Sequence, residues 1–484
     1  MVRAVRSAVA EIDFPLAAPS AATAVAGTDA IRAHLDDYLL PRLTNLAAPL
    51  LVVVGGSTGA GKSTLVNSLV SAPVSAAGVL RPTTRNPVLV CHPTDAAWFR
   101  GQHLFSSLTR GTAPSRLQLI VAPALPPGLA FLDAPDIDSI AAANRELAHR
   151  LFAAADLWLF VTTPNRYADA IPWQLLHHAR ARAAVVALVL ARVPDAVNAE
   201  LVALVSDLLT RQGLSQLPVF VVPESRVDRQ GLLPDHATAR LRTWFDALAA
   251  DQPARVSAAG CTLDGALAAL PAQLTTLANA LEEQVTVAER LAEQVGLAYG
   301  LARGTVERGL RNGVLGSAGE DADQARHRRS AGEVALANLV QSAVADAAEQ
   351  TDSAWRASPA GRALLGASDL GPSPDLPRQV QRAVREQPDG GILPRIERLL
   401  DAEAARWLDR LAGVPASGGA AKRLRELAAE LERVRAAARP QLVESGSAPP
   451  AEEPAAPPEG QVDQPAPPPE PAESSASTEP QEVV

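Results

Sequence analysis

The chain has 484 residues, an apolar fraction of 47% and a formal net charge of −9. This length predicts two to four domains, and the apolar fraction is typical of a globular protein with a buried core. Residues 441–484 carry nine acidic side chains and no lysine or arginine, so the remainder of the chain is formally neutral. No overall basic field is present to attract nucleic acid, and we expect no nucleic-acid partner.

No segment has the pattern of a membrane-spanning helix or a signal peptide. The longest apolar run, Ala183–Ala191, is well short of the roughly 20 residues that a bilayer requires. Cys91 and Cys261 lie far apart and lack metal-ligand spacing, which fits a reducing compartment. We therefore expect a cytoplasmic protein, and any membrane association is expected to be peripheral.

Strands and helices alternate in the first half of the chain. Residues 1–26 are rich in alanine, proline and serine and are predicted to be disordered, whereas 28–46 fit a helix. Seven apolar runs then alternate with helical patterns, and we expect strands at 50–54, 87–92, 117–121, 129–132, 157–162, 185–190 and 219–222. This alternation predicts an α/β fold with a parallel or mixed sheet covered on both faces.

Beyond about residue 255 only helical patterns remain. Apolar residues recur at three- and four-residue spacing, and near the end of the chain the spacing returns; the members are Leu270, Leu274, Leu277, Leu281, Leu424, Leu427, Leu431 and Val434. The pattern predicts an all-α region with an ordinary bundle core, and a coiled coil that binds a partner is the alternative. The tail from residue 441 is rich in proline and glutamate and is predicted to be disordered.

The first strand leads into a glycine-rich loop that fits a phosphate-binding loop. Gly56-x4-Gly61-Lys62-Ser63 stands between an apolar strand and a helical pattern. Glycines let backbone N–H groups approach phosphate oxygens, and the following helix adds its partial positive charge. Lys62 is expected to reach the β- and γ-phosphates, and Ser63 to bind Mg²⁺. The predicted cradle comprises Gly56, Ser57, Thr58, Gly59, Ala60, Gly61, Lys62, Ser63 and Thr64.

Two further stretches complete the predicted site. Arg81–Pro87 lies between the first helix and the next strand, where a threonine of a switch loop would bind Mg²⁺ and sense the γ-phosphate. Asp133 ends an apolar strand, which is the place of the second Mg²⁺ holder. We therefore expect Ser63, a threonine of the first stretch and Asp133 to hold the metal.

At these motifs the chain resembles the dynamin-like large GTPases, in particular an actinobacterial branch. The resemblance rests on Gly56–Thr64, Arg81–Pro87, Asp133–Ile140 and Thr162–Trp173, and it covers residues 28–250 well. It implies that Thr84 is the switch threonine that holds catalytic water and metal, with Thr83 as the second candidate. It further implies that nucleotide drives the GTPase heads into a homodimer and that helical stalks pass the change in nucleotide state to membranes or partners. The helical half also suggests association with peripheral membrane or septal protein partners.

The chain departs from the family pattern in two places. Asp136 stands where the family has glycine; its N–H can meet the γ-phosphate, or with Asp138 it caps the following helix. The base-reading motif is replaced by Ala191-Arg192-Val193-Pro194-Asp195, in which Arg192 is expected to stack on the base and Asp195 to read it from a rearranged turn. The preference for GTP thus comes from the resemblance, and ATP stays an alternative.

We therefore predict a Mg²⁺-dependent GTP-binding and hydrolysing protein of dynamin type, with Lys62, Thr84 and Thr83 as catalytic residues. A nucleotide-binding scaffold with little turnover is the alternative, favoured by Asp136 and the altered base motif. The expected organisation is a disordered segment 1–26, a P-loop GTPase domain with a leading helix at 27–252, a helical bundle or stalk at 253–440, and a disordered tail at 441–484.

Overall fold

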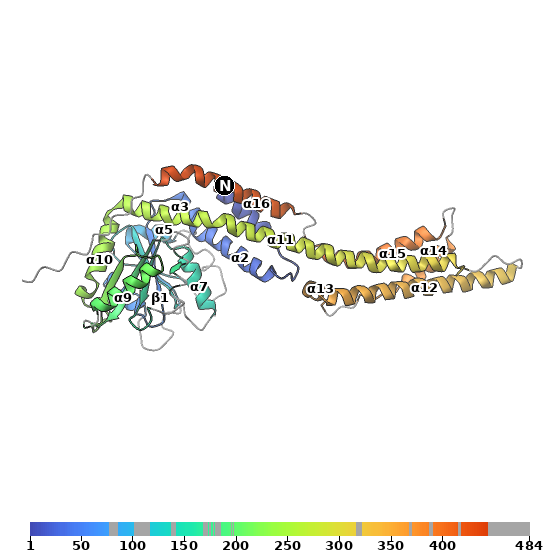
Figure 1. The fold of residues 1–484 in the computed structure, drawn as a ribbon, viewed down its shortest axis with the longest axis horizontal. Helices are drawn as coiled ribbons and strands as arrows, with labels where there is room; N and C mark the ends of the chain where they lie inside the picture. The colour runs from blue at the N-terminus through green and yellow to red at the C-terminus, as the bar shows by residue number, and fades with distance from the viewer. Residues whose placement is uncertain are drawn as a thin grey trace, which may run out of the picture. The chain divides into compact units, whose positions relative to one another are not determined.

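The architecture is shown in Figure 1, taken from a computed structural model of the chain. Its described residues are 1–76, 86–100, 117–136, 142–167, 173, 176–177, 179, 185–194, 196, 198–315, 322–366, 370–386, 391–414 and 418–443. The predictions for Thr83, Thr84, Asp138, Asp195 and the tail from 444 lie outside these residues. In the part described, no helix combines the length and the apolar character needed to cross a membrane.

A seven-stranded mixed sheet forms the centre of the first half, in the order β3-β2-β4-β1-β5-β6-β7. All neighbours run parallel except β2 and β4, which are antiparallel. The bounds are β1 Leu50–Gly56, β2 Val88–Cys91, β3 Gln118–Val121, β4 Leu129–Asp133, β5 Leu157–Thr162, β6 Val185–Val193 and β7 Val219–Pro223. The predicted α/β class and all seven strands are confirmed, and β6 extends to Val193, past its expected end at 190.

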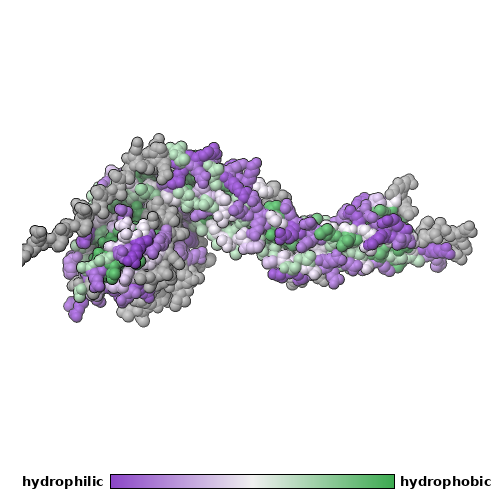
Figure 2. Space-filling model, in the orientation of Figure 1, coloured by the Kyte–Doolittle hydropathy of each residue, from purple (hydrophilic) through white to green (hydrophobic). Residues whose placement is uncertain are grey.

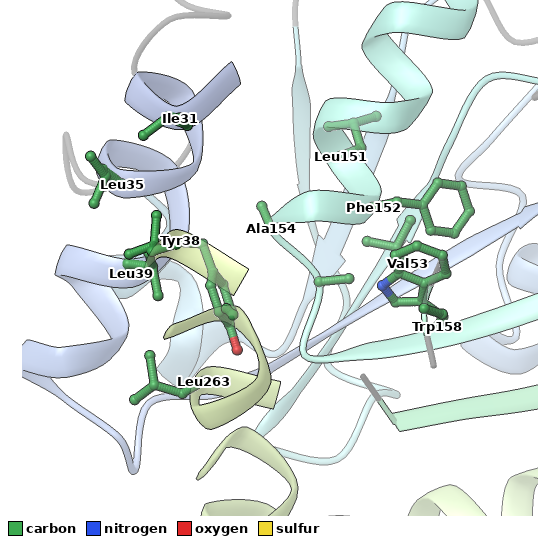
Figure 3. Close-up of a cluster of buried hydrophobic side chains, with 14 of the residues drawn as sticks. Ile31, Leu35, Tyr38, Leu39, Val53, Leu151, Phe152, Ala154, Trp158 and Leu263 are labelled. Atoms are coloured by element: carbon green, nitrogen blue, oxygen red, sulfur yellow. The ribbon is translucent and has the colours of Figure 1, made fainter. Parts of the chain in front are cut away.

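Two apolar layers cover the sheet, because alternate residues of each strand point to opposite faces. Leu50, Val52 and Val54 of β1 face α4 (Lys62–Val70) and α10 (Asp235–Ala250). Leu51 and Val53 face the other layer, part of which is drawn in Figure 3. The helices of that layer include α5 (Ala96–Arg100), α7 (Ala142–Ala153) and α9 (Asn198–Arg211), and a 3₁₀ turn, η2 (Pro93–Asp95), precedes α5.

The prediction of disorder for residues 1–26 is wrong. The structure has α1 (Val2–Glu11) and α2 (Ala21–His34), which continues through a π-turn, η1 (Leu35–Leu39), into α3 (Leu40–Thr44). Val5 and Val9 of α1 are fully buried, and α1 contacts α2 and α16 (Gly419–Val443). A ten-residue helix is marginal alone, so tertiary packing stabilises α1, and composition gave no signal for it.

Long helices form the second half, as predicted. The bounds are α11 Gln252–Arg311, α12 Ala322–Arg356, α13 Pro359–Leu365, α14 Leu376–Arg385, α15 Leu393–Leu408 and a 3₁₀ turn, η4, at Asp409–Leu411. The predicted apolar rows are buried in α11 and α16, except Val434, which is 50% exposed. The first half of α11 packs against α16 and against the apolar layer that contains Leu51 and Val53. Its second half shares a separate core with α12 to α15.

A buried ion pair joins the sheet to the helices around it. Arg42 of α3 donates to the carbonyls of Ala48 and Pro49 and pairs with Asp156, which is fully buried before β5. Asp156 also accepts from the backbone N–H of Leu51 at 2.8 Å, and its carbonyl accepts from Thr262 of α11 at 2.9 Å. Asp156 thus ties α3 and β1 together through its carboxylate, and it contacts the first part of α11 through its backbone carbonyl.

Candidate functional site

Glycines determine the backbone conformation at the end of β1 and in the loop that follows. Gly56 has φ +147°, and a Cβ there would lie 1.9 Å from the carbonyl oxygen of Val161 on β5. Gly59 and Gly61 have φ of 79° and 93°, which side chains rarely adopt. Ala60 N–H donates to Ser57, and α4 begins at Lys62. The sequence motif therefore forms the strand–loop–helix turn that it predicts.

Lys62 lies folded back over this loop and is 5% exposed. Its ammonium donates to the carbonyls of Gly56 and Ser57, both at 3.0 Å, and pairs with the carboxylate of Asp136. A compact ammonium with three donors suits this arrangement of three oxygens. Since Asp136 neutralises the lysine, a phosphate that binds here must share Lys62 with this carboxylate or replace it.

Ser63 and Asp133 meet beside the lysine, as the sequence predicts. The hydroxyl of Ser63 donates to Asp133 Oδ2 at 2.6 Å. Asp133 is placed there because β4 pairs with β1, with Asp133 opposite Val54. The carboxylate is fully buried, and Asp133 Oδ1 has no hydrogen-bond partner in the described part of the chain. A hydroxyl and a carboxylate with an unused oxygen are hard donors that fit Mg²⁺.

Two site residues were missed from the sequence. Ser75 donates to Asp133 Oδ2, the same oxygen that Ser63 uses. Asn67 of α4 holds Ser75 in place: its side chain accepts from the N–H groups of Val74 and Ser75 and donates to the Ser75 carbonyl at 2.8 Å. An asparagine among the apolar residues of α4, between Val66 and Leu69, was the one available signal, and it does not reveal which segment the asparagine holds.

The electrostatics of Asp133 depend on this surrounding. Burial raises the pKa of the Asp133 carboxyl, and Asp136 adds to the rise, whereas Ser63, Ser75 and Lys62 lower it. A cation at the unused oxygen of Asp133 would stabilise the charged carboxylate and so offset the effect of burial.

The opposite end of the loop faces the end of β6. Arg192 stands in a β-bulge between Ala191 and Val193 and has φ 59°, which is uncommon for a residue with a side chain. Its Nε lies 3.9 Å from where a Cβ of Gly61 would stand, and its side chain is exposed. The predicted base-stacking residue is therefore next to the phosphate loop.

The remaining predicted cradle residues lie in the loop or in the first turn of α4; they are Ser57, Thr58, Gly59, Ala60 and Thr64. The structure thus brings together Lys62, Ser63, Asp133 and Asp136 through hydrogen bonds and charge interactions. In the described ranges no group of three or more histidine, cysteine, aspartate or glutamate side chains is arranged as a metal site. Among the described residues, Ser63 and Asp133 are the predicted metal ligands that lie together.

Comparison with sequence families gave no match. Comparison with curated proteins gave none either.

Several solved structures are similar in fold. Era from Aquifex aeolicus bound to GDP and aluminium fluoride matches at 18% identity and a TM-score of 0.28, over 41% of this chain and 56% of that one. Another Era structure, with MgGDPNP and 16S ribosomal RNA, matches at 15% identity and a TM-score of 0.28, over 43% of this chain and 67% of that one.

An oligomerised bacterial dynamin pair, described as sensing and tethering membranes, matches at 10% identity and a TM-score of 0.34 over 92% of this chain and 93% of that one. Era and bacterial dynamins are thus among the solved structures that the chain is similar to.

Proposed function

We propose that the chain is a Mg²⁺-dependent GTPase of dynamin type. One observation carries the proposal: Lys62, Ser63 and Asp133 converge at the carboxyl ends of two adjacent parallel strands, beside a loop whose glycines adopt positive φ angles. This is the place and the chemistry in which α/β proteins bind phosphates.

Each residue has a role that follows from its contacts. Lys62 would neutralise the β- and γ-phosphate oxygens, and the loop N–H groups from Ser57 to Ser63 would bind the phosphate oxygens. Ser63 and Asp133 would hold Mg²⁺, which supplies charge neutralisation to the phosphates when bound. Thr84, with Thr83 as second candidate, is proposed from the resemblance to orient the attacking water.

The test is phosphate release from GTP with and without Mg²⁺. We expect slow turnover that requires the metal and that falls at least about 100-fold in Thr84→Ala. Thr83→Ala is the matched control one residue away. A larger loss of turnover in Thr83→Ala than in Thr84→Ala would assign the orientation of the attacking water to Thr83. Absence of turnover in the unmutated chain would contradict the GTPase proposal and favour a protein that binds nucleotide without hydrolysing it.

A nucleotide-binding scaffold with little turnover is the second candidate, and the Lys62–Asp136 contact favours it. A carboxylate on the loop lysine opposes a γ-phosphate at the same place. Under this alternative the protein binds guanine nucleotide and a partner, and partner binding survives Thr84→Ala. Measurable turnover that disappears with Thr84→Ala would count against it.

The base preference is proposed as guanine. Arg192 beside Gly61 supports a stacking role, but stacking alone does not separate guanine from adenine. Competition of labelled GTP by a hundredfold excess of ATP decides the point. We expect little displacement, and equal displacement by ATP and GTP would assign the ATPase alternative.

The coupling of nucleotide state to the helices is likewise a proposal. Thr262 of α11 donates to the carbonyl of Asp156 at the base of β5, so the sheet and α11 share a direct contact. We propose a GTP-bound homodimer through the heads and peripheral attachment to membranes or septal proteins. Cosedimentation with liposomes, with and without GTP, tests the membrane part, and no pelleting in either state would favour a soluble partner.

A further inference from the structure

The second half of α11 exposes a face that the fold does not use. Leu297 and Leu301 are 64% and 63% exposed, which makes them the most exposed large apolar side chains in the described part of the chain. They lie one turn apart on the same side of the helix. The opposite side is buried against the helical core through Val295, Tyr299, Ala302 and others. Figure 2 shows apolar surface, in green, among the helices of this region.

Glycines lie next to the two leucines. In an α-helix a glycine costs about 1 kcal/mol relative to alanine, so a repeated glycine is unfavourable unless something needs the space. A Cβ at Gly296, Gly300 or Gly304 would have nothing of the described structure within 4 Å. The intramolecular packing therefore gives no reason for these three residues, whose spacing places them in one row beside the leucines.

The same helix shows what such a glycine can accommodate. At Gly309 a Cβ would lie 2.2 Å from Cδ2 of Leu339, so a leucine of α12 fills the space that this glycine leaves. In the described structure, no glycine of another helix lies opposite Leu297 and Leu301, and no leucine of another helix covers Gly300 and Gly304. The leucines and the glycines needed for a contact like that of Gly309 with Leu339 are thus both present on one face of α11.

Charge completes the pattern. Exposed Glu293 precedes the leucines by one turn, and exposed Arg308 follows the glycines by one turn. Arg308 donates to the carbonyl of Gly304 and to the hydroxyl of Thr305 in its own helix. Two rows with four-residue spacing result: Glu293-Leu297-Leu301, and Gly300-Gly304-Arg308. Rows of this spacing are the ridges and grooves by which helices pack.

We propose that this face binds the same face of a second copy of the chain, with the two α11 helices antiparallel. The row Glu293-Leu297-Leu301 of one copy then lies along Arg308-Gly304-Gly300 of the other. Each leucine enters the space over a glycine, and each glutamate faces an arginine. The contact is self-complementary, as a two-fold interface requires. A parallel pairing in the same register would place Glu293 beside Glu293, so charge selects the antiparallel one.

The face is small, so we expect weak association. Residues 293 to 308 span about 23 Å of helix at a rise of 1.5 Å per residue. One helix face of this length buries less than the roughly 800 Å² per partner of a stable dimer. The proposal does not depend on nucleotide binding, and its tests use the full chain without nucleotide, so its failure is separate from failure of the GTPase proposal.

The first test is self-association measured by sedimentation over a range of protein concentrations. We expect Leu301→Glu and Gly300→Leu each to weaken the association at least about tenfold. The matched control is Leu204→Glu, an exposed leucine (50%) on α9, which should leave it unchanged. A chain that stays monomeric at every concentration, or variants that associate like the control, would overturn the proposal.

The second test uses the charges. Glu293→Arg and Arg308→Glu should each weaken association, and the double variant should restore it, because the pair is only exchanged. Loss in both single variants without recovery in the double variant contradicts the register. Liposome binding that depends on Leu301 in a chain that does not self-associate would assign the face to lipid instead.

The third test fixes the direction of the helices. In a Cys261→Ser background, which removes the exposed cysteine, Leu297→Cys on one copy should cross-link to Gly304→Cys on another. Burial raises the pKa of the Cys91 thiol to about 11, so that cysteine stays unreactive. Cross-linking of Leu297→Cys to itself in preference would show a parallel arrangement and overturn the proposal.

Discussion

Two groups of glycines in this molecule have opposite surroundings. At the end of β1 a Cβ on Gly55 would lie 1.8 Å from the ring of Phe152, and one on Gly56 would meet the backbone of β5. In the second half of α11 a Cβ on Gly300 would meet nothing. The crowded glycines shape the loop after β1, whereas the open glycines of α11 weaken their helix and, as proposed above, belong to a surface that binds a second copy of the chain.

The strongest way to break this comparison is Gly56→Ala. The new methyl group must displace backbone of a central strand, and φ +147° is unsuited to a side chain. We expect a loss of at least about 4 kcal/mol in the free energy of unfolding, measured by urea denaturation. Gly231→Ala, which has positive φ but open space around it, is the control and should cost much less. Similar losses at both positions would contradict the crowding argument.

The junction of α3 with the start of β5, where Arg42 pairs with Asp156, is tested by Arg42→Ala. Asp156 would be left buried and unpaired, so we expect a loss of about 3–5 kcal/mol in the free energy of unfolding. The exposed pair of Arg211 with Asp207 gives the control, and Arg211→Ala should cost no more than about 1 kcal/mol. A loss below 1 kcal/mol in Arg42→Ala would show that the buried pair does not stabilise the junction.

Asp136→Asn tests the loop itself. Removing the carboxylate that pairs with Lys62 removes a competitor of the γ-phosphate. We expect triphosphate to bind about tenfold more tightly, about 1.4 kcal/mol, with a smaller effect on diphosphate, in a titration with fluorescent nucleotides. Asp246→Asn, an exposed aspartate on α10, is the control. Weaker triphosphate binding would instead make Asp136 part of the phosphate or metal site.

The smallest expected effect is a gain. Gly300→Ala should raise the free energy of unfolding by up to about 1 kcal/mol, because alanine favours the helix and meets no neighbour. Thermal or urea unfolding at low protein concentration, where self-association is negligible, measures it. Gly309→Ala, which would collide with Leu339, should destabilise instead. A loss in Gly300→Ala would contradict the view that the fold leaves this position open.

The sequence predicts the sheet well because buried parallel strands are continuous apolar runs. β5 is found at its predicted bounds, and Asp133 follows from its place at the end of β4. It does not predict α1, because α1 packs against α2 and against α16, and α16 comes from the other end of the chain.

In the site, the motif alone gives Lys62 and Ser63, but not what they contact. The pairing of Lys62 with Asp136 and the donation from Ser75 to Asp133 join segments that lie far apart in sequence. Local patterns carry no information on such contacts, because hydrogen bonds between loops depend on the packing of the helices between them. Asn67 is an example, since its buried amide fixes the position of Ser75.

Binding of GTP in the presence of Mg²⁺, measured by calorimetry on the full chain and on Lys62→Ala, tests the central claim most directly. We predict saturable binding to the unchanged chain that weakens when Mg²⁺ is removed, and a loss of at least about 100-fold in Lys62→Ala with no change in its helical content. Equal binding by both proteins, or no binding by either, would contradict the assignment of this loop as the nucleotide site.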